Sequence, residues 1–214
     1  SASWPPLPPP AEDRIRAELA ISTVIVCGLA DDMPPPESET ILYSAEEIQA
    51  RVRAIARAID ADHQTEVPLH VVGVLKGSFV FAADLIRAMQ TPLTLDFIVI
   101  ASYLDGATSS GEIQLLKDLD SAIEGRPVLI VEDIVDTGRT LHYLHAVLQA
   151  RGPSSLKTAC LLSKPSRRAV DVPVDYVGFE IDDRFVVGYG LDHAEQFRHL
   201  PHIAVIEPPA APPR

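Results

Sequence analysis

The chain has 214 residues, of which 47% are hydrophobic and 22% charged, as is ordinary for a soluble globular protein. Its formal net charge of −12 argues against a large nucleic-acid-binding surface, because such surfaces need clustered Lys and Arg to neutralise phosphate. Two cysteines, Cys27 and Cys160, exclude a disulfide framework, and the longest apolar run, residues 20–30, is too short to span a bilayer. We therefore expect a cytoplasmic protein with neither a nucleic-acid nor a membrane partner.

Proline-rich segments mark both ends of the chain. Residues 1–10 carry five prolines and residues 207–214 carry four. Proline lacks a backbone donor and resists both helix and central strand. We therefore expect residues 1–40 to form a partly disordered N-terminal extension, residues 207–214 to form a tail, and residues 41–206 to form the folded domain.

Helical and strand patterns alternate through residues 41–206. Ser44 and Glu47 fit a capping box that opens a helix running to about residue 62. We expect further helices at 78–89 and 139–150, and strands at 69–75, 93–102, 113–117, 128–131, 156–162, 176–181, 185–189 and 203–206. This alternation indicates an α/β fold with a central, mainly parallel sheet, and the strand-rich part after residue 164 indicates a small added subdomain.

The segment 128–141 carries the strongest functional signal. Its apolar strand ends in two adjacent acids, Glu132 and Asp133, and a third acid, Asp136, opens a short Thr/Gly loop before a helix. In open α/β sheets ligands bind beyond the carboxyl ends of the strands, and a loop of small residues at a helix N-terminus offers N–H groups to an anion. Acids beside a phosphate repel it unless they bind its hydroxyls or a cation. The segment therefore indicates a site for a phosphorylated ligand; the alternative is a chance strand–turn–helix with solvated acids.

The loop is not one of the two most common phosphate-binding motifs, since GxGxxG and GxxxxGK[ST] are both absent. The segment 128–141 instead resembles the phosphoribosyl-pyrophosphate motif of type I phosphoribosyltransferases. Four further segments occur in the order and spacing of the hypoxanthine-guanine branch of that family: Leu75–Gly77, Ser102–Tyr103, Ser163–Pro165, and Phe185–Asp192 with Arg198 beyond. The resemblance covers about residues 41–206 and implies that family's fold, a mainly parallel sheet flanked by helices with a small hood subdomain.

The resemblance also implies a magnesium-dependent enzyme of purine salvage. Such an enzyme transfers the 5-phosphoribosyl group from phosphoribosyl pyrophosphate to hypoxanthine, guanine or both, giving IMP or GMP and pyrophosphate. The implied partners are phosphoribosyl pyrophosphate, a 6-oxopurine base and the nucleoside monophosphate product, and the implied assembly is a homodimer or homotetramer. The preference among hypoxanthine, guanine and xanthine stays open.

Residue roles for phosphoribosyl pyrophosphate follow from the same resemblance. Glu132 and Asp133 correspond to the acids that hold the ribose hydroxyls, directly or through Mg²⁺, and Asp192 corresponds to a further Mg²⁺ ligand. Asp136 corresponds to the general base at N7 of the purine; the alternative role for this residue is a helix cap. The expected contacts to the 5′-phosphate are Thr137, Gly138, Arg139 and Thr140, and those to pyrophosphate are Lys76, Gly77 and Arg198.

The base is expected to contact Lys164, Phe185, Val186 and Asp192. Lys164 resembles the lysine that donates to the purine O6, and Phe185 resembles the ring that stacks on the base. Taken alone, Lys164 reads as a loop residue and Phe185 as a core residue, so these roles depend on the family.

Two segments near the pyrophosphate position complete the expectations. Ser102 and Tyr103 resemble the start of the family's lid loop, and the following Leu104 and Asp105 are bulkier than the small residues common there in bacterial relatives. The resemblance also implies a cis or ligand-switchable Leu75–Lys76 peptide bond beside the pyrophosphate.

Two other functions share this fold. A regulator that senses phosphoribosyl pyrophosphate and binds nucleic acid would need a basic face or an added DNA-binding domain, and often lacks the acid at Asp136. An enzyme for another base, such as xanthine or a pyrimidine, would differ at Lys164 and Phe185 or in backbone contacts that the sequence does not display.

Overall fold

The computed structural model describes residues 40–102 and 113–206 of the chain. The helices within them are α2 (Ala45–Asp62), α3 (Phe79–Ala88) and α4 (Arg139–Gln149), with a short 3₁₀ turn at Pro165–Arg167. The strands are β1 (Thr40–Tyr43), β2 (Leu69–Leu75), β3 (Leu93–Ser102), β4 (Ile113–Lys117), β5 (Pro127–Val135), β6 (Ser155–Ser163), β7 (Tyr176–Glu180), β8 (Val186–Val187) and β9 (Ile203–Val205). The expected N-terminal extension and the tail lie outside these residues, apart from residue 40 in β1.

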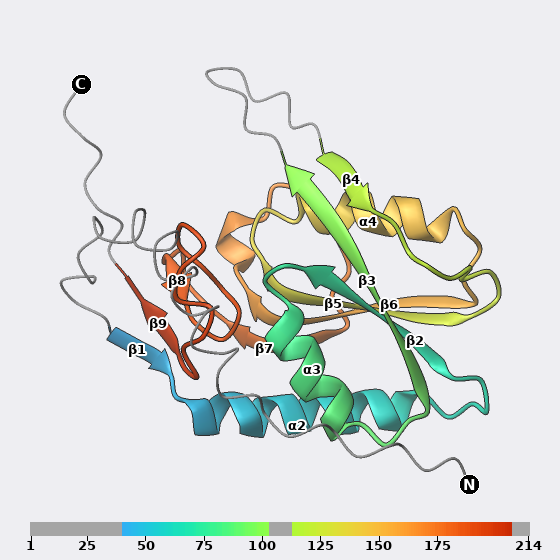
Figure 1. Ribbon diagram of the computed structural model, residues 1–214, viewed down its shortest axis with the longest axis horizontal. Coiled ribbons are helices and arrows are strands. Elements are labelled where there is room, and N and C mark those ends of the chain that lie inside the picture. The colour runs from blue at the N-terminus through green and yellow to red at the C-terminus, as the bar shows by residue number, and fades with distance from the viewer. Residues whose placement is uncertain (1–39, 103–112, 207–214) are drawn as a thin grey trace, which may run out of the picture. The chain divides into compact units, whose positions relative to one another are not determined.

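A six-stranded sheet in the order β4-β3-β2-β5-β6-β7 forms the centre of the domain (Figure 1). Its neighbouring strands run parallel except for β3 and β4, which are antiparallel. This arrangement confirms the mainly parallel α/β sheet expected from the alternation of helices and strands.

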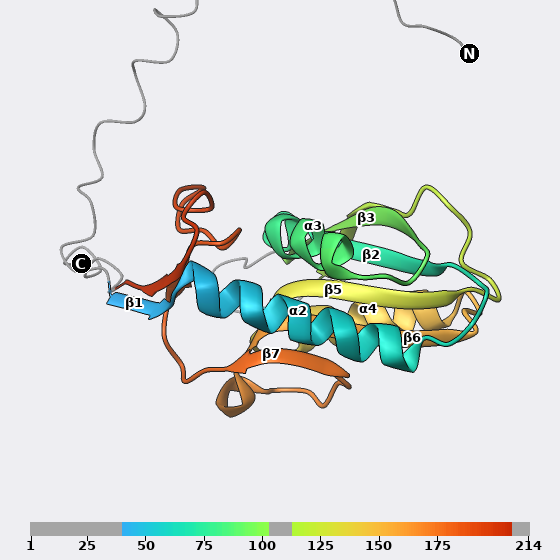
Figure 2. The same cartoon turned by 90° about the horizontal axis from the view of Figure 1, so that it is seen from below.

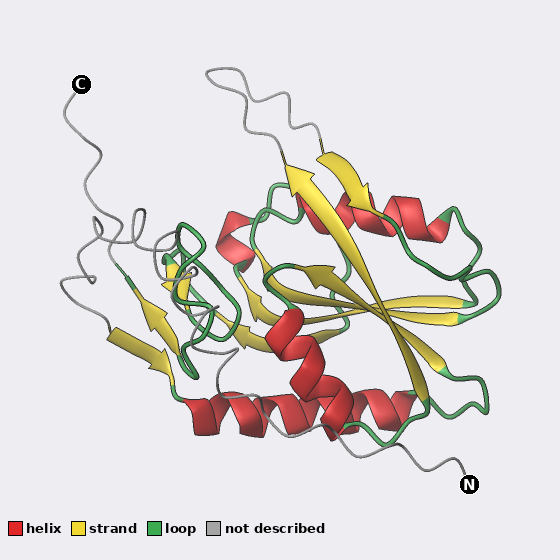
Figure 3. Ribbon diagram, in the orientation of Figure 1, coloured by secondary structure: helices red, strands yellow, loops and turns green. Residues whose placement is uncertain are grey.

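Two apolar clusters cover the two faces of this sheet. Successive residues of a strand point to opposite faces, so Val71 packs in the cluster that contains Ile48 of α2 and Phe81 of α3, whereas Val72 packs with Leu144 of α4. The helices therefore flank the sheet, as the colouring by secondary structure shows (Figure 3). None of the helices in the described parts of the chain is long and apolar enough to cross a membrane.

The capping box at the start of α2 is confirmed. The Ser44 hydroxyl accepts a hydrogen bond from the N–H of Glu47 at 3.3 Å, and the Glu47 carboxylate accepts one from the N–H of Ser44 at 2.9 Å. Two of the N–H groups that a helix start leaves unpaired are thereby satisfied. The cap fixes where the chain turns from β1 into α2.

A second, three-stranded sheet has the order β1-β9-β8 and is antiparallel. Both Figure 1 and Figure 2 show it beside the end of the main sheet toward which β7 points. The added subdomain expected after residue 164 is therefore present, but it borrows β1 from the start of the domain, while β7 joins the main sheet beside β6.

The strand expected at 185–189 is much shorter than the sequence pattern indicated. β8 ends at Val187 because the next three residues, Gly188, Tyr189 and Gly190, have φ angles of 97°, 52° and 100°. Positive φ values are incompatible with an extended strand. The chain therefore turns sharply here and leads into the segment that carries Asp192 and Arg198.

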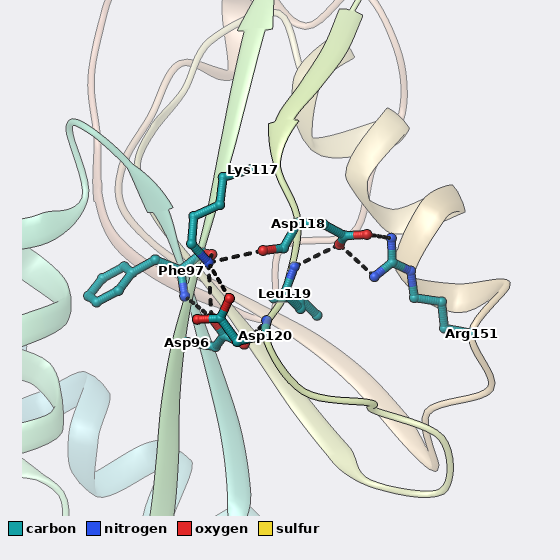
Figure 4. A network of polar contacts seen from close by, with 7 residues as sticks. All are labelled: Asp96, Phe97, Lys117, Asp118, Leu119, Asp120 and Arg151. Carbon is teal, nitrogen blue, oxygen red and sulfur yellow. Dashed lines mark hydrogen bonds and ion pairs between the residues drawn. The ribbon is translucent and has the colours of Figure 1, made fainter.

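A polar network joins the first half of β3, at Asp96 and Phe97, to the end of β4 and the segment that follows it (Figure 4). The buried Asp96 carboxylate accepts hydrogen bonds from the N–H groups of Phe97 and Asp120, at 2.7 Å each, and lies 3.5 Å from the Lys117 ammonium. Burial alone would raise the pKa of Asp96, but these donors lower it below its ordinary value. The network fixes β4 against β3.

Asp96→Ala is expected to lower the free energy of unfolding by about 1–3 kcal/mol, because it leaves two backbone donors and an ammonium without their acceptor. Urea denaturation measures this loss. Asp120→Ala is the matched control: its carboxylate lies 3.3 Å from the same Lys117 ammonium, but both side chains are exposed, and the substitution keeps the Asp120 N–H. Exposed ion pairs contribute little, so a loss in the control equal to that of Asp96→Ala would contradict the role assigned to the network.

Candidate active site

The expected site residues follow the carboxyl ends of three neighbouring parallel strands. Lys76 follows β2, Asp136 follows β5 and Lys164 follows β6. Since β2, β5 and β6 are adjacent and parallel, these ends meet at one edge of the sheet. This edge is where open α/β sheets bind ligands.

The two adjacent acids lie within β5 rather than after it, because the strand extends to Val135. Glu132 is buried and Asp133 is half-buried. Burial, and secondarily the charge of Asp133, raises the pKa of Glu132 well above its ordinary value. Burial also raises the pKa of Asp133 to about 6, with Arg198 lowering it and Asp192 raising it. Burial is thus the main reason why both carboxyl groups hold a proton more readily than exposed ones.

The segment after β2 makes two tight contacts at Gly77. One is with the Asp133 side chain of β5, and the other is with the backbone of the turn after β8. At Gly77 a Cβ atom would overlap the carboxylate of Asp133, and at Gly190 a Cβ atom would overlap the carbonyl oxygen of Gly77. At Gly190 the obstacle is backbone, so only glycine fits there; at Gly77 the obstacle is the Asp133 side chain, which a larger residue would have to displace. The Leu75–Lys76 peptide bond beside this contact is cis, as expected.

The loop between β5 and α4 is shaped by the segment that follows β6. The carbonyl oxygen of Thr137 accepts hydrogen bonds from the N–H groups of Ala169 at 3.0 Å and Val170 at 3.4 Å. Gly138 has a φ of 81°, and a Cβ atom there would lie 3.0 Å from the Val170 carbonyl oxygen. Gly138 at the N-cap has no side chain to offer, and the Thr137 hydroxyl accepts a hydrogen bond from the N–H of Arg139 at 3.5 Å. The N–H groups in the first turn of α4, which begins at the exposed Arg139 and the half-buried Thr140, lack intrahelical partners and suit an anion.

Two basic side chains, Lys164 and Arg167, lie between the carboxylates of Asp136 and Asp183. The Asp136 carboxylate accepts a hydrogen bond from the Arg167 Nε at 3.2 Å and lies 4.0 Å from the Nζ of the buried Lys164. Both cations also approach Asp183, with Lys164 at 3.6 Å and Arg167 at 3.4 Å. A carboxylate and a buried ammonium thus lie side by side where β5 and β6 end.

The segment after β8 carries a cluster of charged side chains that contacts Lys76, the residue that follows β2. Arg198 pairs with Asp192 at 2.7 Å and with Glu195 at 3.5 Å, and Glu195 pairs with Lys76 at 2.9 Å. The Asp192 carboxylate also accepts the N–H of Glu195 at 2.9 Å. Lys76, Asp192 and Arg198 are therefore brought together through Glu195.

The aromatic residue expected at the base position lies on the small sheet. Phe185 is 41% exposed and meets the His193 ring edge-on, with 5.2 Å between ring centroids. Val186 is buried in β8. Exposure of so large an apolar ring leaves one of its faces available for stacking.

Three site residues were not expected from the sequence: Arg167, Asp183 and Glu195. For Arg167 and Asp183, the sequence offered one signal: basic residues gather at 164–168 and acidic residues at 182–183, so the two groups could attract each other. Of the expected lid residues, Ser102 ends β3, whereas Tyr103, Leu104 and Asp105 lie outside the described residues.

The described residues contain no cluster of three or more His, Cys, Asp or Glu side chains that could hold a metal ion by themselves. The three expected metal ligands, Glu132, Asp133 and Asp192, are nevertheless all carboxylates, the ligand type that Mg²⁺ takes. Asp133 and Asp192 are close enough for the charge of Asp192 to raise the pKa of Asp133. Mg²⁺ is usually held by one or two carboxylates together with substrate phosphates, so these residues fit a cation that arrives with its substrate.

A family model described as the phosphoribosyl transferase domain matches residues 39–194. The chain belongs to the phosphoribosyltransferase family. Among curated relatives of this phosphoribosyltransferase, the hypoxanthine-guanine phosphoribosyltransferase of Bacillus subtilis (strain 168) is 48% identical over 170 residues, covering 79% of this chain and 94% of the relative. The corresponding protein of Streptococcus agalactiae serotype V is 46% identical over 167 residues, covering 78% and 92%.

Solved structures agree with this assignment. A hypoxanthine-guanine phosphoribosyltransferase from Bacillus anthracis is 46% identical with a TM-score of 0.74, covering 79% of this chain and 97% of that chain. A hypoxanthine phosphoribosyltransferase from Staphylococcus aureus is 45% identical with a TM-score of 0.75, covering 79% and 91%. This phosphoribosyltransferase therefore lies in the hypoxanthine-guanine branch, as its motifs indicated.

Proposed function

We propose that this phosphoribosyltransferase acts in purine salvage, transferring the 5-phosphoribosyl group from phosphoribosyl pyrophosphate to hypoxanthine, guanine or both. The observation that carries the proposal is the pairing of the Asp136 carboxylate with the buried Lys164 ammonium, 4.0 Å apart. Atoms N7 and O6 of a 6-oxopurine lie on the same edge of the base. A carboxylate suits the N7 proton and an ammonium suits O6. The names of its relatives support the same substrates.

Catalysis is assigned to Asp136 as the general base. It would accept the N7 proton while N9 bonds to the anomeric carbon and the bond from that carbon to pyrophosphate oxygen breaks. Lys164 would hold O6, and Phe185 would stack on the base with Val186 and Asp192 beside it. Together these contacts fix the nucleophile in line with the anomeric carbon.

The phosphoribosyl end is assigned to the remaining residues of the sheet edge. Glu132 and Asp133 would hold the ribose hydroxyls. The 5′-phosphate would lie at the N-terminus of α4, held by Thr137, Gly138, Arg139 and Thr140. The pyrophosphate would lie against Lys76, Gly77 and Arg198.

Magnesium completes the proposed site. Glu132, Asp133 and Asp192 would hold it together with the pyrophosphate. When bound it neutralises charge on the leaving group. The chain's own residues then need only to orient the substrates and accept one proton.

Gly190→Ala is expected to lower kcat/KM for phosphoribosyl pyrophosphate at least tenfold, or about 1.4 kcal/mol. The added methyl group would overlap the Gly77 carbonyl oxygen and displace the segment assigned to pyrophosphate. Gly125→Ala is the control, because Gly125 also has a positive φ, 69°, but nothing lies within 4 Å of its Cβ position. Steady-state kinetics of both variants measure the difference, and equal losses would show that backbone strain alone is responsible.

Two rival functions remain to be tested against this one. The charge of −12 and the presence of Asp136 disfavour a nucleic-acid-binding regulator. An enzyme for another base is tested by pyrophosphate release with hypoxanthine, guanine, xanthine, adenine and uracil in parallel. We expect hypoxanthine, guanine or both to support release and adenine and uracil not to; release with uracil or adenine alone would overturn the assignment.

We further propose that the protein is cytoplasmic, binds neither nucleic acid nor membranes, and assembles as a homodimer or homotetramer. The two cysteines and the negative net charge support the compartment and the absence of nucleic acid. Light scattering coupled to gel filtration measures the assembly, and a monomer at micromolar concentration would contradict it.

A further inference from the structure

Tyr189 occupies a conformation that its residue type disfavours. It has a φ of 52° and lies between two glycines that also have positive φ. For a residue with a side chain, the left-handed region costs about 1–2 kcal/mol. Such a residue persists where its surroundings hold it, so the contacts of Tyr189 show what holds this turn.

The Tyr189 side chain crosses to the helices on the main sheet. It is only 4% exposed, and its hydroxyl donates to the Asp84 carboxylate of α3 at 2.7 Å. The same Asp84 oxygen accepts a hydrogen bond from Gln49 of α2, and Arg87 lies 3.7 Å from the other oxygen. Burial, and secondarily the Asp84 contact, raises the pKa of Tyr189 above its ordinary value, so the phenol stays a donor.

The backbone on either side of Tyr189 leads directly to the proposed pyrophosphate end. The N–H of Gly190 donates to the Arg198 carbonyl oxygen at 3.0 Å, and Arg198 donates back to the Gly190 carbonyl oxygen at 2.8 Å. Gly190 packs against Gly77, and Arg198 pairs with Asp192. The position of Tyr189 therefore sets the positions of Gly190 and Arg198 beside the proposed pyrophosphate site, and through Arg198 that of Asp192, which is assigned to the metal as well as to the base. The two side chains assigned to hold the base itself, Lys164 and Phe185, are not part of this set of contacts.

We infer that Tyr189, anchored on Asp84, is a positioning residue for phosphoribosyl pyrophosphate. This inference rests on the proposed function. The Tyr189 phenol does not touch the substrate; it holds Gly190, Arg198 and Asp192 against the segment after β2. Its loss should therefore weaken one substrate selectively, whereas a general loss of structure would affect both.

Tyr189→Phe tests this by removing one hydroxyl. We expect KM for phosphoribosyl pyrophosphate to rise about tenfold, the usual effect of a lost hydrogen bond to a charged group, while KM for hypoxanthine changes less than twofold. Calorimetric titration with phosphoribosyl pyrophosphate and Mg²⁺, without base, should show the same loss of affinity. Asp84→Asn, which keeps an acceptor but removes its charge, should give a smaller shift in the same direction.

Tyr176→Phe is the matched control. Tyr176 is 8% exposed and its hydroxyl donates to the Asp62 carboxylate at 2.8 Å, but it begins β7 at the opposite end of the strands. We expect both KM values to stay unchanged in this variant. An unchanged KM for phosphoribosyl pyrophosphate in Tyr189→Phe, or equal rises for both substrates, would overturn the inference. Absence of IMP formation by the unmutated protein would instead overturn the proposed function.

Discussion

Asp136→Asn is expected to lower kcat by about 10²–10⁴-fold, the usual contribution of a general base. Asparagine keeps the size of the side chain and one oxygen for Arg167, but it cannot accept the N7 proton. Because none of the groups assigned to the phosphates changes, binding of phosphoribosyl pyrophosphate should persist. Steady-state turnover and calorimetric titration of the same purified variant measure the two quantities separately.

Asp183→Asn is the control for this substitution. Asp183 contacts the same two cations as Asp136, at 3.6 Å from Lys164 and 3.4 Å from Arg167. It follows β7 rather than β5, however, and has no assigned part in proton transfer. We expect its loss to lower kcat by less than tenfold. Near-normal turnover in Asp136→Asn, or equal losses in both variants, would remove Asp136 from the role of base.

Lys164→Ala is expected to lower kcat/KM for a 6-oxopurine by about 10- to 100-fold, the value of a hydrogen bond from a charged donor. The KM for phosphoribosyl pyrophosphate should change no more than about threefold, since Lys164 lies beside Asp136 and Asp183 and is not among the residues assigned to the phosphates. Kinetics with each substrate varied in turn separate the two effects.

Lys157→Ala provides the comparison for Lys164. Both lysines lie along the β6 segment, but Lys157 is near its beginning and pairs with Asp62. Its removal should leave the kinetics with both substrates unchanged. A loss in Lys164→Ala that is equal for the base and for phosphoribosyl pyrophosphate would contradict the assignment of Lys164 to O6.

The sequence predicted the β5–α4 region well because its signals are local. The apolar strand, the acids and the glycine-bearing loop are contiguous, and strand, turn and helix follow from neighbouring residues. The helix at α2 was predictable for the same reason, since Ser44 and Glu47 cap it through contacts three residues apart. The roles of the acids, in contrast, came from the family resemblance.

The parts that were missed depend on contacts between distant segments. Arg167, Asp183 and Glu195 look like solvated loop charges, and only the fold brings Arg167 to Asp136 and Glu195 to Lys76. The strand expected at 185–189 is shorter in the structure because the apolar pattern continues through Tyr189, whereas the backbone takes positive φ from Gly188 onward and the Tyr189 side chain turns to Asp84. Propensity gives way to tertiary contacts at such positions.

The most direct test of the central claim is product formation by the purified chain with phosphoribosyl pyrophosphate, hypoxanthine and Mg²⁺. We predict IMP and pyrophosphate in equal amounts, with formation lost when EDTA removes the metal and restored when Mg²⁺ is returned. The Asp136→Asn variant, assayed in parallel, should form both products at least about 100-fold more slowly. No IMP from the unmutated protein, or IMP formation that persists unchanged in Asp136→Asn, would contradict the account.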